Sequence, residues 1–142
     1  MSYTRRPGWD VRLYELVRLR HNTTFAWGSQ DCATFAAEAV LALTGHRPPL
    51  PGPWSTAREA LRAIAGAGGL QAAVQAVLGP CGTPSLAQRG DIVLIEQPES
   101  LGGEALGVHM GTYAIATGPH GLVRVPLEAV RCCWHILAEG VF

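Results

Sequence analysis

The sequence contains little charge. Only 15% of its 142 residues are charged, and 11 Lys and Arg residues balance 11 Asp and Glu residues, giving a formal net charge of +0. Binding to nucleic acid or to an anionic membrane normally requires an excess of basic residues, so we expect neither partner. Hydrophobic residues make up 48%, which is too many for a disordered chain. The length then predicts a single folded domain spanning residues 1–142.

Long apolar runs are also missing. No stretch of about 18 uncharged apolar residues occurs, which predicts no membrane span. The first residues, from Met1 to Pro7, include Arg5 and Arg6 and lead into a charged segment rather than an apolar one. We therefore expect no signal peptide and synthesis in the cytoplasm.

The four cysteines, Cys32, Cys81, Cys132 and Cys133, do not form a pattern typical of a disulfide framework or a metal centre. Without a secretion signal, a chain of this size is expected to keep its cysteines reduced. A zinc site usually shows Cys-x-x-Cys pairs or mixed Cys and His spacing. Two of these cysteines are adjacent and would point to opposite faces of a strand, and the other two stand alone. We expect no metal and no cofactor.

Helical spacing dominates the first half of the chain, about 9–79. Apolar residues at intervals of three and four predict helices over 9–20, 32–44, 57–66 and 70–78. Gly28 is expected to provide the turn before the second helix, and Asp31 to cap it. The second helix carries the longest apolar stripe, which predicts that it is the central buried helix.

Strand-like spacing begins near residue 89 and continues to about 138. Short segments rich in aliphatic residues predict strands over 91–96, 105–111, 112–117, 122–125 and 132–137. Residues 118–121, Gly-Pro-His-Gly, predict a hairpin turn. Helices followed by a meander of strands indicate an α+β fold with an antiparallel sheet.

Trp54 lies at the end of a proline-rich loop, residues 46–54, and allows two interpretations. Exposed in a stiff loop, it would be an efficient anchor for a protein partner, because little entropy is lost on binding. Alternatively, it tucks back against the domain ahead of the third helix. The residue pattern does not separate these two.

Cys32 is the best candidate for a reactive side chain. It lies in the first turn of a predicted helix, where free N–H groups and the helix dipole stabilise a thiolate. Packing in the apolar stripe explains its position equally well. A nucleophilic cysteine also needs an imidazole as base. His21, His46 and His120 fall at a helix end, in the proline loop and in a turn, which leaves His109, with small residues around it, and the weaker candidate His135.

Three segments of the chain resemble the papain-like cell-wall peptidases of the NlpC type. Residues 25–37 look like their cysteine-helix motif, 88–93 like their first-strand motif, and 106–111 like the hairpin that follows. The resemblance is strongest to short proteins of tailed bacteriophages and prophages that are encoded among tail-tip genes. It extends from about residue 9 to residue 136 and implies a papain-like fold with Cys32 as the nucleophile.

The same resemblance places an alanine where the active peptidases carry their catalytic histidine. That position falls on Ala105, and the polar residue that orients the histidine falls near Thr117. His109 is on the same strand face as Ala105 but four residues further along, a distance of about 13 Å.

We therefore expect a structural tail-tip or baseplate component of the virion with weak or lost catalysis, whose partners are other tail and baseplate hub proteins. The alternative is an active cysteine amidase or endopeptidase that cleaves peptidoglycan peptides during phage entry. Its nucleophile would be Cys32, its base His109, and a nearby backbone N–H its oxyanion donor.

Overall fold

The fold combines four helices with one curled antiparallel sheet, as described for residues 3–137 in a computed structural model. The helices are α1 (Trp9–Arg20), α2 (Cys32–Thr44), α3 (Ala57–Gly66) and α4 (Leu70–Leu78). The expected helices are confirmed with these bounds, because each depends on local apolar spacing and on clear start and stop signals.

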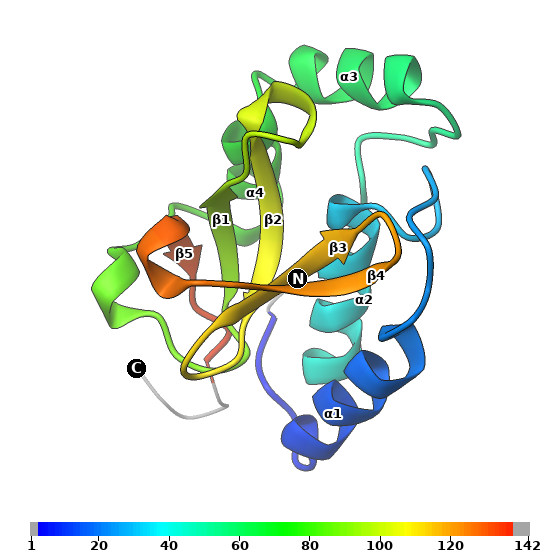
Figure 1. The fold of residues 1–142 in the computed structure, drawn as a ribbon. Helices are drawn as coiled ribbons and strands as arrows, with labels where there is room; N and C mark the ends of the chain where they lie inside the picture. The colour runs from blue at the N-terminus through cyan, green and yellow to red at the C-terminus, as the bar shows by residue number, and fades with distance from the viewer. Residues whose placement is uncertain (1–2, 138–142) are drawn as a thin grey trace.

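The sheet contains β1 (Ile92–Glu96), β2 (Glu104–His109), β3 (Ala114–Gly118), β4 (Gly121–Val125) and β5 (Val130–Trp134). Its strand order is β4-β3-β2-β1-β5, and all the pairings are antiparallel. The expected strands are found with ends shifted by at most three residues, and the turn at 118–121 joins β3 to β4. In Figure 1, β3 and β4 cross in front of β1 and β2, which shows how strongly the sheet curls.

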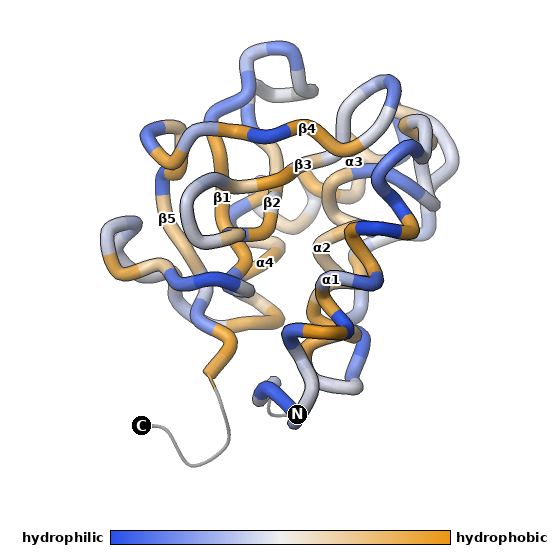
Figure 2. Tube along the Cα trace, turned by 60° about the horizontal axis from the view of Figure 1, so that its bottom comes forward, coloured by the Kyte–Doolittle hydropathy of each residue, from blue (hydrophilic) through white to orange (hydrophobic). Residues whose placement is uncertain are grey.

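Each face of the sheet has its own core. On one face α2 and α4 pack against residues that include Leu94, Leu106 and Trp134. The curl closes a smaller core on the other face, around Val93 and Ala105. Figure 2 shows the resulting hydrophobic residues along β1 and β2. Cys132 belongs to the first core and Cys133 to the second, so the adjacent cysteines do point to opposite faces.

The start of α2 is fixed by buried hydrogen bonds. Asp31 caps the helix, because its Oδ1 accepts from the N–H of Thr34 at 2.8 Å. Its Oδ2 accepts from the N–H of Gly28 at 2.7 Å and from the indole Nε1 of Trp54 at 2.8 Å. Gly28 has φ of +87°, and a Cβ there would lie 2.4 Å from the carbonyl oxygen of Trp54. The expected roles of Gly28 and Asp31 are confirmed.

Trp54 is buried, with 7% of its surface exposed. The interpretation of Trp54 as an exposed anchor for a partner is therefore wrong, and the alternative, that it tucks back against the domain, is correct. The reason is chemical, since the indole N–H finds the Asp31 carboxylate and the ring closes over the apolar side of α2.

Among residues 3–137, no single helix is long and apolar enough to cross a membrane. Together, α3 and α4 reach that length and composition, as a pair bent by 62°.

Candidate functional site

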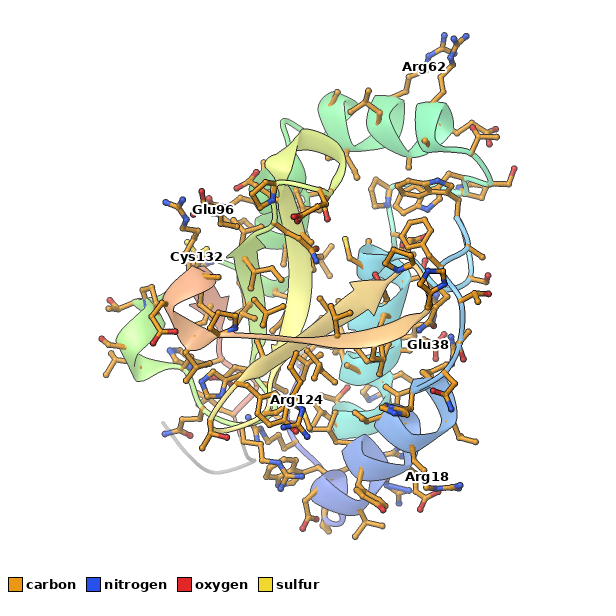
Figure 3. All side chains as sticks on the ribbon, in the orientation of Figure 1. Arg18, Glu38, Arg62, Glu96, Arg124 and Cys132 are labelled. Carbon is orange, nitrogen blue, oxygen red and sulfur yellow. The ribbon has the colours of Figure 1, made fainter. Side chains whose placement is uncertain are left out.

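A groove with a volume of about 700 Å³ opens beside the start of α2. Its wall is made by α3, the start of α4, the segment before β2 and the turn between β3 and β4. Apolar and aromatic side chains cover much of it, and the exposed residues Glu99 and Glu104 also line it. Arg62 of α3 points away into solvent (Figure 3). We call this space the cysteine groove, because Cys32 is part of its lining.

The thiol of Cys32 is a poor nucleophile in this setting. Burial raises its pKa to about 11, and the neighbouring Asp31 carboxylate acts in the same direction. Backbone N–H groups of Leu106, Ala33 and Cys32 itself favour the thiolate but do not offset the burial. A thiol with this pKa is almost entirely protonated at neutral pH, whereas a reactive cysteine has its pKa lowered.

The side chains around Cys32 supply no base. Ala105 is 2% exposed and belongs to the core against which Cys32 packs, so a methyl group occupies the position where the resemblance predicts an imidazole. Thr117 is buried and lines the groove. Within residues 3–137, no hydrogen bond joins the Cys32 thiol to a histidine ring.

His109, the candidate base, lies at the other end of β2. Its ring Nδ1 accepts from the N–H of Gly111 at 3.1 Å, and its backbone pairs with Asp91. Burial lowers the pKa of His109, an effect that the Asp91 carboxylate opposes. The structure therefore does not bring Cys32 and His109 together, and their pairing remains a prediction without structural support.

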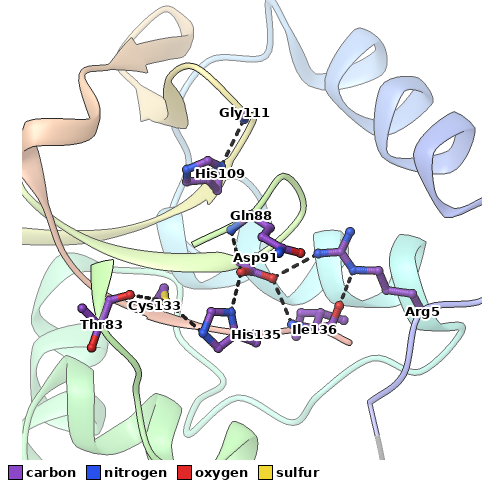
Figure 4. Close-up of polar contacts among 9 residues, drawn as sticks. All are labelled: Arg5, Thr83, Gln88, Asp91, His109, Gly111, Cys133, His135 and Ile136. Atoms are coloured by element: carbon purple, nitrogen blue, oxygen red, sulfur yellow. Dashed lines mark hydrogen bonds and ion pairs between the residues drawn. The ribbon is translucent and has the colours of Figure 1, made fainter. Parts of the chain in front are cut away.

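A second group of polar side chains gathers where β1 begins (Figure 4). We call it the Asp91 cluster; it comprises Arg5, Gln88, Asp91, His135 and Ile136. Oδ1 of Asp91 accepts from Nη2 of Arg5 at 3.0 Å and from the N–H of Ile136 at 3.1 Å. Oδ2 accepts from the N–H of Gln88 at 2.8 Å and pairs with Nδ1 of His135 at 2.8 Å. This buried carboxylate ties the N-terminal segment to both β1 and the end of β5.

Cys133 lies beside this cluster. Its Sγ is 3.7 Å from Nε2 of His135 and 3.4 Å from the carbonyl oxygen of Thr83. Burial raises the pKa of the Cys133 thiol, and Asp91 raises it further. The thiol, the imidazole and the carboxylate lie within 4.8 Å of one another.

Residues 4–136 match the DUF6950 family, described as a domain of unknown function. The chain belongs to the DUF6950 family. No curated protein matches it.

The DUF6950 domain thus presents two separate sites. The cysteine groove has space for a ligand but no base for its thiol, while the Asp91 cluster has an imidazole, a thiol and a carboxylate in a confined place. The sequence does contain a signal for the second site, which is the spacing of two residues along a strand rather than the spacing along a helix. Cys133 and His135 are two residues apart on an extended segment, which puts both side chains on one face.

Proposed function

We propose that this DUF6950 protein is a structural component of a bacteriophage tail tip, with a papain-like fold of the NlpC type and without peptidase activity. The observation that carries the proposal is that Ala105, which has no ionisable side chain, belongs to the core against which Cys32 packs. Cysteine peptidases need an imidazole within hydrogen-bond reach of the thiol. The raised pKa of Cys32 is consistent with its absence.

The tail-tip assignment is supported by the resemblance of the segments 25–37, 88–93 and 106–111, in that order, to phage proteins of this type. The fold agrees with what that resemblance implies at the level of its layers: a cysteine-bearing helix packed on an antiparallel sheet. The cysteine groove offers space for a ligand beside a protonated Cys32 thiol. This combination suits a role in binding rather than in bond cleavage.

A complementation experiment separates a structural role from an enzymatic one. The gene is deleted from the phage that encodes the chain, and particles are examined by electron microscopy and plating. We expect particles with defective tail tips, fully rescued by a Cys32→Ser copy and by the control Cys132→Ser. Rescue by Cys132→Ser but not by Cys32→Ser would support the active amidase instead. Normal, infectious particles without the gene would refute the tail-tip role.

Thiol alkylation tests the chemistry directly in the purified protein. Iodoacetamide is applied across pH and the modified peptide containing Cys32 is quantified by mass spectrometry. We expect a midpoint near pH 11, following the pKa of Cys32. A wild-type midpoint below about 7 that rises in His109→Ala would establish a working Cys–His pair.

A further inference from the structure

We propose that Cys133 and His135 form a binding site for a zinc ion, with Asp91 holding the imidazole in position. This site is separate from the cysteine groove and does not depend on the proposed tail-tip function. A thiolate and an imidazole are the ligands that Zn²⁺ prefers.

The distances suit two ligands of one tetrahedral ion. Bonds of about 2.3 Å to sulfur and about 2.0 Å to nitrogen, opened to the tetrahedral angle, separate the two ligand atoms by about 3.5 Å. The Sγ of Cys133 and the Nε2 of His135 are 3.7 Å apart. The carbonyl oxygen of Thr83 lies 3.4 Å from Sγ, a separation that also suits two ligands of one ion, with water completing the coordination shell.

Asp91 orients the imidazole rather than binding the ion. Each of its carboxylate oxygens already has two partners: Arg5 and Ile136 at Oδ1, Gln88 and His135 at Oδ2. In the neutral ring, the hydrogen bond to Oδ2 of Asp91 favours the tautomer with its proton on Nδ1 of His135, which leaves Nε2, the nitrogen nearer Cys133, as the metal ligand. A carboxylate–histidine pair of this kind is the usual outer support of a zinc ligand.

Gly82 keeps the space beside Nε2 open. The segment carrying it is fixed to β5 by a pair of backbone hydrogen bonds between Gly82 and Cys133, at 2.7 and 3.2 Å. A Cβ on Gly82 would lie only 3.1 Å from Nε2 of His135. Its φ is not positive, so the backbone does not require glycine there, and the missing side chain leaves room at the metal-binding nitrogen.

The site is also reachable from solvent. The side chain of His135 is 32% exposed, whereas that of Asp91 is 2% exposed and Cys133 is fully buried. An ion would therefore enter on the imidazole side and bind the sulfur beneath it. Binding replaces the thiol proton, which is released to solvent as the S–Zn bond forms.

Cobalt titration of the metal-free protein tests the site, because Co²⁺ replaces Zn²⁺ and its bond to a thiolate gives a strong near-ultraviolet absorption. We expect this band in the wild-type protein and its displacement by Zn²⁺. His135→Asn should weaken Co²⁺ binding at least tenfold, since its amide can still donate to Asp91 but offers no ligand at the position of Nε2. Cys133→Ser should abolish the band, and Gly82→Ala should weaken binding by crowding Nε2.

Two control variants each remove one cysteine outside the proposed site. Cys132→Ser and Cys32→Ser should bind Co²⁺ as the wild type does. The proposal is overturned if the wild-type protein gives no thiolate band, if His135→Asn binds Co²⁺ with unchanged affinity, or if Cys132→Ser loses the band. Should Cys133→Ser not fold, His135→Asn decides the outcome, because its ring is partly exposed and its replacement keeps the contact with Asp91.

Discussion

The two ends of β2 differ in how their ionisable groups are partnered. At the Glu104 end, the cysteine groove is open, and within residues 3–137 no hydrogen bond joins the Cys32 thiol to an imidazole. At the His109 end, the Asp91 carboxylate is buried and every one of its acceptor positions is filled. The groove end therefore retains space without a reactive pair, whereas the other end uses its charged side chains to join distant segments. Variants that damage one end only should show how far the two are independent.

Removing the carboxylate of Asp91 should have the largest effect on folding. Asp91→Ala leaves the Arg5 guanidinium, which is 9% exposed, without its anion. It also leaves the backbone N–H groups of Gln88 and Ile136 without their acceptor. Loss of one partner of a buried ion pair costs about 4 kcal/mol of unfolding free energy. Urea denaturation measures this loss.

Glu15→Ala is the matched control for Asp91→Ala. The pair between Glu15 and Arg18 is exposed, with 49% and 57% of the side-chain surfaces accessible, so its loss should cost less than about 1 kcal/mol. If the unfolding free energy of Asp91→Ala also stayed within about 1 kcal/mol of the wild type, the Asp91 cluster would not hold the N-terminal segment.

This contrast also explains what the sequence could predict. The helices and the cap at Asp31 depend on residues close together in the chain, so local spacing predicts them. The resemblance predicts a missing base near Cys32 from one position, Ala105. The Asp91 cluster was missed because its contacts join residues as far apart as Arg5 and Asp91, 86 positions away. The residue pattern does not predict the burial of Trp54 for the same reason, since its partner Asp31 is 23 residues away.

At the groove end, Asp31→Ala should be the most damaging change. It removes the helix cap, which lowers the unfolding free energy by about 1 kcal/mol. It also leaves the buried indole N–H of Trp54 without an acceptor, which lowers the unfolding free energy by about 2 kcal/mol more. We expect a loss of about 3 kcal/mol in urea denaturation. Trp54→Phe keeps a ring but removes the donor and should lose clearly less. Wild-type stability in Asp31→Ala would rule out both roles of this carboxylate.

The Cys32 thiol should make the protein sensitive to alkali. Its pKa is about 11 when folded and about 8.5 in an unfolded chain, so folding favours the protonated thiol. Its contribution to stability is complete below pH 8.5 and is lost as the pH rises toward 11. Between pH 8.5 and 10 we expect a loss of about 1 to 2 kcal/mol from this residue.

Cys32→Ser isolates this contribution, since the other three cysteines remain. Its stability should fall less steeply than that of the wild type between pH 8.5 and 10, while below pH 8 the difference between the two proteins stays constant. Parallel curves throughout that alkaline interval would mean that the thiol is solvated and that the wall of the groove does not enclose it.

The smallest effect should come from the outer wall of the groove. Thr56 caps α3 by accepting from the N–H of Glu59 at 3.1 Å, and the Glu59 carboxylate accepts in return from the N–H of Ser55 at 2.9 Å. All three residues are exposed, so water replaces a lost partner. Thr56→Ala should therefore lower the unfolding free energy by about 1 kcal/mol, against about 3 kcal/mol for the buried cap at Asp31. Ser55→Ala, which removes a hydroxyl but no cap, should stay within about 0.5 kcal/mol of the wild type. If Thr56→Ala proved as costly as Asp31→Ala, α3 would be held as firmly as α2, and the groove would be a rigid cleft rather than one with a weakly fixed wall.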